Sequence, residues 1–150
     1  APLRPEARES TIMAMDMQAN ASSVHQAGRA ARRIIEDARR TIGGVIGSRA
    51  EDIIFTSGGT EANALALHGA LAKLDNPVLF YTDLEHPAVR DVALSGRYRT
   101  VRVEAAPTGQ IDLNDLSEKL SQTAGATPLL TLMHANNETG IVQPVSEFIL

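Results

Sequence analysis

Three short polar segments carry the residue types that could do chemistry in this sequence, and each follows an apolar run. Gly58, Gly59 and Thr60 follow the run "IIF", His86 follows "VLFY" and a short polar link, and Asn137 follows "LLTLM". Glycines that open a helix leave N–H groups free to bind an anion. A histidine can transfer protons near neutral pH, and asparagines that end a buried strand must find hydrogen-bond partners.

Each segment also has a plainer structural interpretation, which the residues alone leave open. The glycines fit a tight turn with Thr60 as a helix N-cap, and their spacing matches neither a Walker loop nor a GxGxxG motif. His86 could be a capping or packing residue, and residues 136–140 equally fit a turn. The other histidines are interpreted as surface or packing residues: His25, His68 and His134.

Alternating helical and strand patterns predict the elements that position these segments. Strands are expected at 52–57, 77–83, 98–104 and 127–135, and helices at 4–17, 27–46, 59–74, 86–96 and 112–123. Nearly continuous apolar strands separated by helices predict an α/β fold, a mainly parallel sheet with helices on both faces. Ligands bind such sheets beyond the carboxyl ends of the strands, so the three polar segments are expected at one edge.

Composition narrows the functional classes. The chain has 150 residues, 43% hydrophobic and 21% charged, a net charge of −4 and no cysteine. These values favour a globular protein and give no general attraction to nucleic acid or to an acidic membrane. Without cysteine the chain offers no disulfide, no thiolate metal site and no cysteine nucleophile, and no metal site is expected. No apolar run is long enough to span a bilayer, and a cytoplasmic location is the default expectation.

Four ordered motifs resemble one enzyme family. The stretches "FTSGGTEANALALHG", "EHPAV", "GQIDL" and "MHANNETGIVQPV" are similar to those of the cysteine desulfurases, which are pyridoxal-phosphate enzymes grouped with the class V aminotransferases. "NASSVHQAGRAAR" resembles the loop and long helix of the same family, and the likeness runs from Pro2 to about Ser146. The resemblance implies part of the large domain of the aspartate-aminotransferase-like, fold type I transferases. Residues 1–150 would be the N-terminal part of that cofactor-binding domain, without its remainder or the C-terminal small domain.

The resemblance also assigns site residues. Gly59 and Thr60 would hold the phosphate of pyridoxal 5′-phosphate, and His86 would lie over the pyridine ring and move protons. Asn137 would hydrogen-bond the phenolic oxygen of the ring, and Asn20 would lie near the substrate carboxylate.

The activity that the resemblance implies is conversion of L-cysteine to L-alanine with a persulfide left on an enzyme cysteine. Implied partners are a second copy of the protein and a sulfur acceptor or iron–sulfur scaffold protein. Lys73 and Lys119 fall on amphipathic helices, so neither is expected to hold the cofactor covalently. The family's lysine, its aspartate and its cysteine would lie beyond this chain, and the 150 residues alone are expected to be inactive. Three alternatives stay open: a selenocysteine lyase, an aminotransferase, or a non-catalytic remnant that binds the cofactor or a partner.

Overall fold

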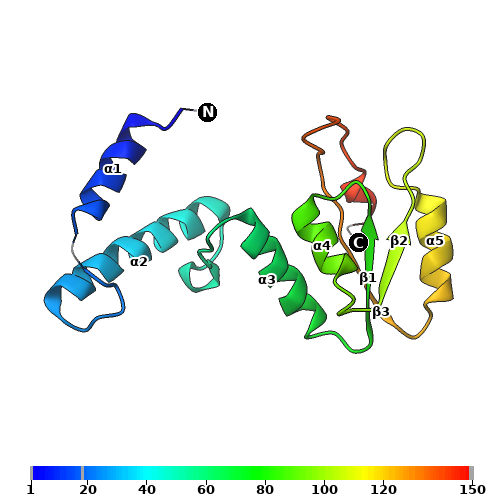
Figure 1. The fold of residues 1–150 in the computed structure, drawn as a ribbon, viewed down its shortest axis with the longest axis horizontal. Helices are drawn as coiled ribbons and strands as arrows, with labels where there is room; N and C mark the ends of the chain where they lie inside the picture. The colour runs from blue at the N-terminus through cyan, green and yellow to red at the C-terminus, as the bar shows by residue number, and fades with distance from the viewer. Residues whose placement is uncertain (1, 18, 149–150) are drawn as a thin grey trace. The chain divides into compact units, whose positions relative to one another are not determined.

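The structure, a computed structural model, describes residues 2–17 and 19–148 and divides the chain into two compact units. Unit 1 spans Ala1–Phe55 and unit 2 spans Thr56–Leu150. The elements of unit 1 are helical, whereas the three described strands all lie in unit 2 (Figure 1).

Unit 1 contains α1 (Pro5–Met15), α2 (Gln26–Ile46) and the short 3-10 helix η1 (Ala50–Asp52). Both long helices were expected from the periodicity. Pro5 occupies the first turn of α1, where its missing N–H costs nothing. The N-cap of α2 is His25, whose Nδ1 accepts a hydrogen bond from the backbone N–H of Gly28 at 3.2 Å. His25 is therefore a helix-capping residue, whereas only a surface or packing role was expected of it.

The apolar stripe of α2 is present but uncovered within unit 1. Its largest apolar side chains keep substantial exposure: Ile34, Ile35, Ile42, Val45 and Ile46. On the polar side, Arg40 pairs with Asp37 at 2.6 Å, as expected for a solvated helix face. Although α2 has 21 residues, none of the described helices is both long and apolar enough to cross a membrane.

The strand expected at 52–57 is not formed. The backbone at Ile53 is extended, but no described residue pairs with this segment as a ladder neighbour. Ile54 is 69% exposed and Phe55 46%, although a buried strand was predicted. An apolar run gives β-propensity, but a strand exists only where a neighbour supplies its hydrogen bonds. Here Arg39 donates to the Ile53 carbonyl and lies over the Phe55 ring, 5.1 Å from its centroid.

Unit 2 is built on a three-stranded parallel sheet in the order β2-β1-β3. The strands are β1 (Pro77–Thr82), β2 (Thr100–Val103) and β3 (Thr127–Leu130). Phe80 in the central strand pairs with Val101 on one side and with Leu130 on the other. The parallel sheet was predicted, but with one strand more than the described residues form and with longer strands than they show.

Three helices of unit 2 follow the predicted pattern: α3 (Gly59–Leu71), α4 (Pro87–Leu94) and α5 (Leu113–Gln122). The unit also contains the 3-10 helix η2 (Val145–Phe148). Asp112 caps α5 as expected, because its carboxylate accepts hydrogen bonds from the N–H groups of Asn114 and Asp115 at 2.9 and 3.2 Å. Gly96 lies just past the end of α4 with φ +73°, a left-handed conformation typical of glycine at this position.

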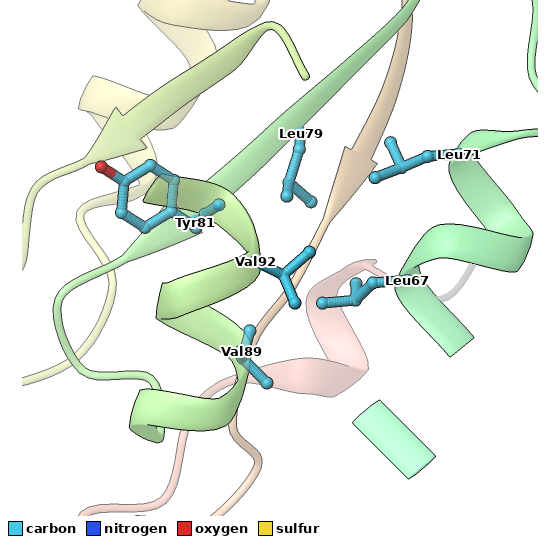
Figure 2. Close-up of a cluster of buried hydrophobic side chains, with 7 residues drawn as sticks. Leu67, Leu71, Leu79, Tyr81, Val89 and Val92 are labelled. Atoms are coloured by element: carbon cyan, nitrogen blue, oxygen red, sulfur yellow. The ribbon is translucent and has the colours of Figure 1, made fainter. Parts of the chain in front are cut away.

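Helices cover both faces of the sheet. On one face Leu79 and Tyr81 of β1 pack against α3 and α4, as Figure 2 shows, in a cluster that also holds Leu67, Leu71, Val89, Val92 and Ala93. On the other face Val78 and Phe80 pack with residues of β2, α5 and η2: Val103, Leu116 and Phe148, together with Ile111. Successive side chains of β1 point to opposite faces of the sheet, and both faces are covered. The strand is therefore buried along almost its whole length.

A buried glutamine fastens the loop after β2 to the loop after β3. Gln143 is 3% exposed, and its Oε1 accepts from the backbone N–H of Ile111 at 2.8 Å. Its Nε2 donates to the carbonyl of Gly109 at 3.0 Å. Gly109 has φ +80°, and a Cβ there would clash with the side chain of Ile141. A larger residue at position 109 would require the end of the Ile141 side chain to shift, in addition to adopting the left-handed backbone.

We predict that Gln143→Ala lowers the free energy of unfolding by about 2 kcal/mol, because the buried N–H of Ile111 and the partly buried carbonyl of Gly109 lose their partners. The control is Gln110→Ala, which removes an exposed side-chain hydrogen bond to the Val142 carbonyl in the same pair of loops. That control should cost under about 1 kcal/mol. Urea denaturation of the two variants makes the comparison, and equal losses would contradict the buried clamp.

Candidate functional site

The candidate site lies where the chain leaves β1 and β3, two neighbouring parallel strands. After β1 the chain passes to α4, which packs on the face that contains Leu79. After β3 it passes to η2, whose Phe148 packs on the opposite face. Connections that diverge from adjacent strands open a crevice at the carboxyl ends, which is where ligands bind in sheets of this kind.

The turn after β1 is organised by Thr82, which is fully buried. Its hydroxyl accepts from the backbone N–H of Leu84 at 3.2 Å, and its carbonyl accepts from the N–H of Glu85 at 3.4 Å. These bonds form a turn directly after β1, and His86 follows it as the N-cap of α4, four residues past the end of the strand.

His86 is the N-cap of α4, and its Nε2 makes no hydrogen bond to any residue that the structure describes. Its Nδ1 accepts from the backbone N–H of Ala88 at 3.1 Å, and Pro87 fills the first helical position. In the neutral imidazole an accepting Nδ1 places the proton on Nε2. Of the two interpretations that the sequence left open, capping is therefore correct for one nitrogen, while the other is available to a ligand.

The turn after β3 is held by Asn136. Its Oδ1 accepts from the N–H groups of Glu138 and Thr139, both at 2.9 Å, and its Nδ2 donates to the Leu84 carbonyl at 3.1 Å. Asn136 thus fastens this turn to the turn after β1. The neighbouring Asn137 is exposed, and its side chain makes no hydrogen bond to any residue that the structure describes. Asn137 is therefore the amide that is free to meet a ligand.

Two adjoining cavities lie at this edge. The first, of about 290 Å³, is lined by residues 83–87, Arg90, Met133 and residues 136–139. The second, of about 320 Å³, lies between α3, α4 and the chain after β3; Asn63 and Leu67 line it with Val89 and residues 131–133. Glu85, His86 and Met133 line both cavities, so these three residues lie between the two.

The start of α3 differs in detail from the expected cap. The N-cap is Gly58 and the helix begins at Gly59, so the structural alternative that made Thr60 the N-cap is wrong. No side chain caps the helix, but Glu61 in its first turn reaches back to Ser57, and its carboxylate accepts from the backbone N–H and the hydroxyl of Ser57 at 2.7 and 2.6 Å. The same Ser57 hydroxyl holds the pKa of Glu61 below its usual value.

This helix start remains open to an anion. Among the described residues, no group accepts from the backbone N–H groups of Gly59 and Thr60. A Cβ added at Gly58 or Gly59 would meet nothing within 4 Å, so the space beside both glycines is open. Free N–H donors at the positive end of a helix, with unobstructed backbone beside them, suit a phosphate.

The structure brings together some of the predicted site residues. His86 and Asn137 line the same cavity. Thr60 lines neither cavity, but Asn63, one turn further along α3, lines the second cavity with His86. Asn20 lies in unit 1, where its Oδ1 accepts from the N–H of Ser22 at 2.9 Å, so its assignment to the substrate carboxylate stays a prediction.

Sequence reasoning missed Glu85 and Asn63 as residues of this edge. Glu85 is 7% exposed despite its charge, and burial raises its pKa above the usual value for a carboxyl group. Its position in the sequence could have indicated a role, because Glu85 directly precedes His86 and follows a strand predicted to be buried. Nothing in the sequence distinguished Asn63, because a polar residue in the first turns of a helix usually belongs to a solvent-exposed face.

The remaining two histidines behave as packing or surface groups. His68 on α3 hydrogen-bonds through Nδ1 to the hydroxyl of Tyr98 at 2.6 Å, away from the cavities. His134 is exposed, and its carbonyl accepts from the N–H of Gln143 at 2.8 Å. The plain interpretation of both is confirmed.

Comparison with known proteins places the chain in a family. The sequence model of the family described as aminotransferase class-V matches residues 8–150. An IscS-like cysteine desulfurase of Mycobacterium tuberculosis is 36% identical over 97% of this chain, and the selenocysteine lyase of Homo sapiens is 34% identical over 97%. The chain spans 39% and 38% of the lengths of these two relatives.

A solved structure gives the same result for the fold. The NifS-like protein from Rickettsia africae superposes with a TM-score of 0.81 at 30% identity, over 98% of this chain and 41% of that protein. The mainly parallel sheet with helices on both faces, predicted from the sequence, is therefore that of the NifS-like fold.

We predict that His86 is found as the Nε2-protonated tautomer when neutral, because Nδ1 accepts from Ala88. Long-range proton–nitrogen NMR spectra of ¹⁵N-histidine-labelled protein report which ring nitrogen carries the proton. His86→Asn should keep the cap and His86→Ala should cost about 1 kcal/mol of stability. An Nδ1-protonated ring, or equal stability of the two variants, would show that the capping bond is absent in solution.

Proposed function

Because the chain belongs to the aminotransferase class-V family, we propose that it is the N-terminal part of the cofactor-binding domain of a cysteine desulfurase. The parent protein would convert L-cysteine to L-alanine and leave a persulfide on a cysteine of its own. One observation carries the proposal: His86 and Asn137, which follow two different strands, line one cavity at the carboxyl edge of the sheet.

The described residues fit pyridoxal 5′-phosphate. The free N–H groups of Gly59 and Thr60 suit the phosphate, and Asn137 offers an unused amide to the phenolic oxygen. His86 forms the wall of the cavity and offers a flat ring for an aromatic group to stack on. When bound, the cofactor supplies an electron sink for the amino-acid substrate.

His86 is suited to hold and move a proton at Nε2. The bond from Ala88 fixes Nδ1, so the ring cannot turn freely and Nε2 keeps its direction. A positioned imidazole transfers protons most effectively when the operating pH lies near its own pKa. The two ring nitrogens have separate roles: Nδ1 fixes the orientation of the ring, and Nε2 would transfer the proton.

Neither lysine of the chain is placed to hold the cofactor covalently. Lys119 donates to Asp115 and to the Arg102 carbonyl, both at 2.8 Å. Lys73 follows the C-terminal end of α3, a 13-residue helix about 20 Å long, whereas Thr60 lies at its start. The lysine, like the cysteine that would receive the sulfur, is therefore proposed to belong to the rest of the parent protein.

A selenocysteine lyase is the second candidate, because the human enzyme is similar over nearly the whole chain. The proposal includes a homodimer in the cytoplasm that passes sulfur to an acceptor or to an iron–sulfur scaffold protein. Alanine formation from L-cysteine and from L-selenocysteine, measured on the full-length parent, separates the two candidates. Turnover of L-selenocysteine alone would replace the desulfurase by the lyase.

In the full-length parent, we predict that His86→Ala keeps the cofactor but loses at least about 100-fold in alanine formation, since a general acid–base group contributes roughly that much. Thr60→Ala should instead lower cofactor occupancy, because it removes a hydroxyl at the phosphate. Occupancy is measured by absorbance and alanine by amino-acid analysis. Equal losses of occupancy, or full activity of the His86 variant, would mean that these two roles are wrongly assigned.

We also predict that the 150-residue chain forms no specific covalent adduct with pyridoxal 5′-phosphate. Borohydride treatment fixes any lysine adduct, and peptide mapping then locates it. Only sparse, non-stoichiometric labelling is expected, with the full-length parent as the positive control. Stoichiometric labelling of Lys73 or Lys119 would show that the placement argument is wrong.

A further inference from the structure

Glu85 is the only buried charged residue in the part of the chain that the structure describes, and the proposed chemistry gives it no task. It is 7% exposed and lines both cavities of the candidate site. Its Oε1 is buried and has no hydrogen-bond partner within residues 2–17 and 19–148. Buried charges in proteins are paired with an opposite charge or bind a metal ion, so this carboxylate needs a partner that the chain does not provide.

No positive group of the described chain balances the charge of Glu85. His86 lines both cavities and Arg90 lines the first, but neither forms an ion pair with Glu85. The ion pairs of unit 2 join other residues: Arg102 with Asp83 and Glu104, and Lys119 with Asp115. Burial raises the pKa of Glu85, because the charged form loses water without gaining a counter-ion. A bound cation is the counter-ion that this place lacks.

Neutral oxygen atoms line the second cavity beside Glu85. Asn63 and Thr131 belong to its wall, and the side chain of Asn63 makes no hydrogen bond to any residue in the described ranges. The Thr131 hydroxyl donates to the Phe80 carbonyl at 3.4 Å, which leaves its lone pairs free. The carbonyl groups of residues 131–133 accept no hydrogen bond from the rest of the described chain. Carboxylate, amide, hydroxyl and carbonyl oxygens are the ligands that hard cations prefer.

The charge of the site indicates which kind of cation it suits. Glu85 supplies a single negative charge to the second cavity, and its other polar lining residues are neutral apart from His86. The described residues contain no group of three histidine or acidic side chains that could hold a metal ion together. Divalent and transition-metal ions are bound through more charge or through nitrogen and sulfur ligands. One carboxylate with several neutral oxygens therefore matches a cation of single charge.

We propose that the second cavity binds a monovalent alkali-metal cation, with the Glu85 carboxylate balancing its charge and oxygens of Asn63, Thr131 and the nearby backbone as neutral ligands. Such a cation joins three segments that meet at this cavity: α3, the turn after β1 and the chain after β3. It thereby stabilises the wall that contains His86. The site needs neither cofactor nor substrate, so it is independent of the proposed function.

The first test measures thermal unfolding of the full-length parent without cofactor or substrate. At equal ionic strength, about 100 mM potassium or sodium chloride should raise the melting temperature by about 2 °C over tetramethylammonium chloride, because a cation that binds only the folded state stabilises it. Tetramethylammonium has the same charge, but its methyl groups prevent coordination by oxygen atoms. Equal melting temperatures in the three salts would overturn the proposal.

Two matched variants test the charge. Glu85→Gln keeps the size and one oxygen of the side chain but removes its negative charge, so the difference between the salts should disappear. Glu138→Gln loses the same charge at an exposed acid that lines only the first cavity, so the difference should persist. A difference that persists in Glu85→Gln, or that is lost in Glu138→Gln, would overturn the assignment to Glu85.

Two further variants test the neutral ligands. The potassium concentration that gives half of the stabilisation should rise about threefold or more in Asn63→Ala and in Thr131→Val, because each lacks one oxygen ligand. Asn114→Ala removes an exposed amide at the start of α5 and should leave this concentration unchanged. Unchanged values in both cavity variants would overturn the placement in the second cavity. No turnover enters these measurements, so a wild type that forms no alanine from L-cysteine refutes the proposed function alone.

Discussion

The parallel pairing of β1 with β3 is the interaction on which the candidate site depends. Phe80 stands opposite Leu130, and the Phe80 carbonyl accepts from the N–H of Thr131 at 2.9 Å, just past the end of β3. This register decides which residues on each side first leave the sheet. A slip of one residue would turn the side chains of β3 to the opposite face and separate His86 from Asn137. The packing on both faces of β1 is what holds the register in place.

Within each polar segment, one group is used by the fold and its neighbour is left for a ligand. Asn136 holds two turns together, and Asn137 is free. In His86 the same division runs between the two nitrogens of one ring. At the start of α3, Glu61 takes the hydrogen bonds of Ser57, while the N–H groups of Gly59 and Thr60 stay open. Adjacent polar residues at the end of a strand can therefore have different roles: one holds the turn and the next is exposed to a ligand.

The sequence predicted most of the fold and the edge of the sheet at which the candidate site lies. Periodicity predicted the helices of both units, and the apolar runs at β1, β2 and β3 predicted a parallel sheet covered on two faces. It failed at 52–57, because apolar character cannot show whether a strand has a neighbour to bond with. It also passed over Glu85, since the burial of an acid depends on which distant segment packs above it, here the one that contains Met133. Which of two adjacent asparagines is free is a matter of turn geometry and not of residue type.

The topology of unit 2 also sets an order of events during synthesis. The bond from Asn136 to the Leu84 carbonyl joins residues 52 positions apart, and the bond from Thr131 to Phe80 spans a similar distance. β1 leaves the ribosome long before β3 and has its apolar residues exposed until its central position in the sheet can be filled. Contacts between residues so distant in sequence form late and slow the folding of a domain. The nascent chain thus carries a buried-type strand without its second neighbour, β3, for the time taken to add about fifty residues, several seconds at ribosomal speed. During that interval β1 is the segment that a chaperone would be expected to bind.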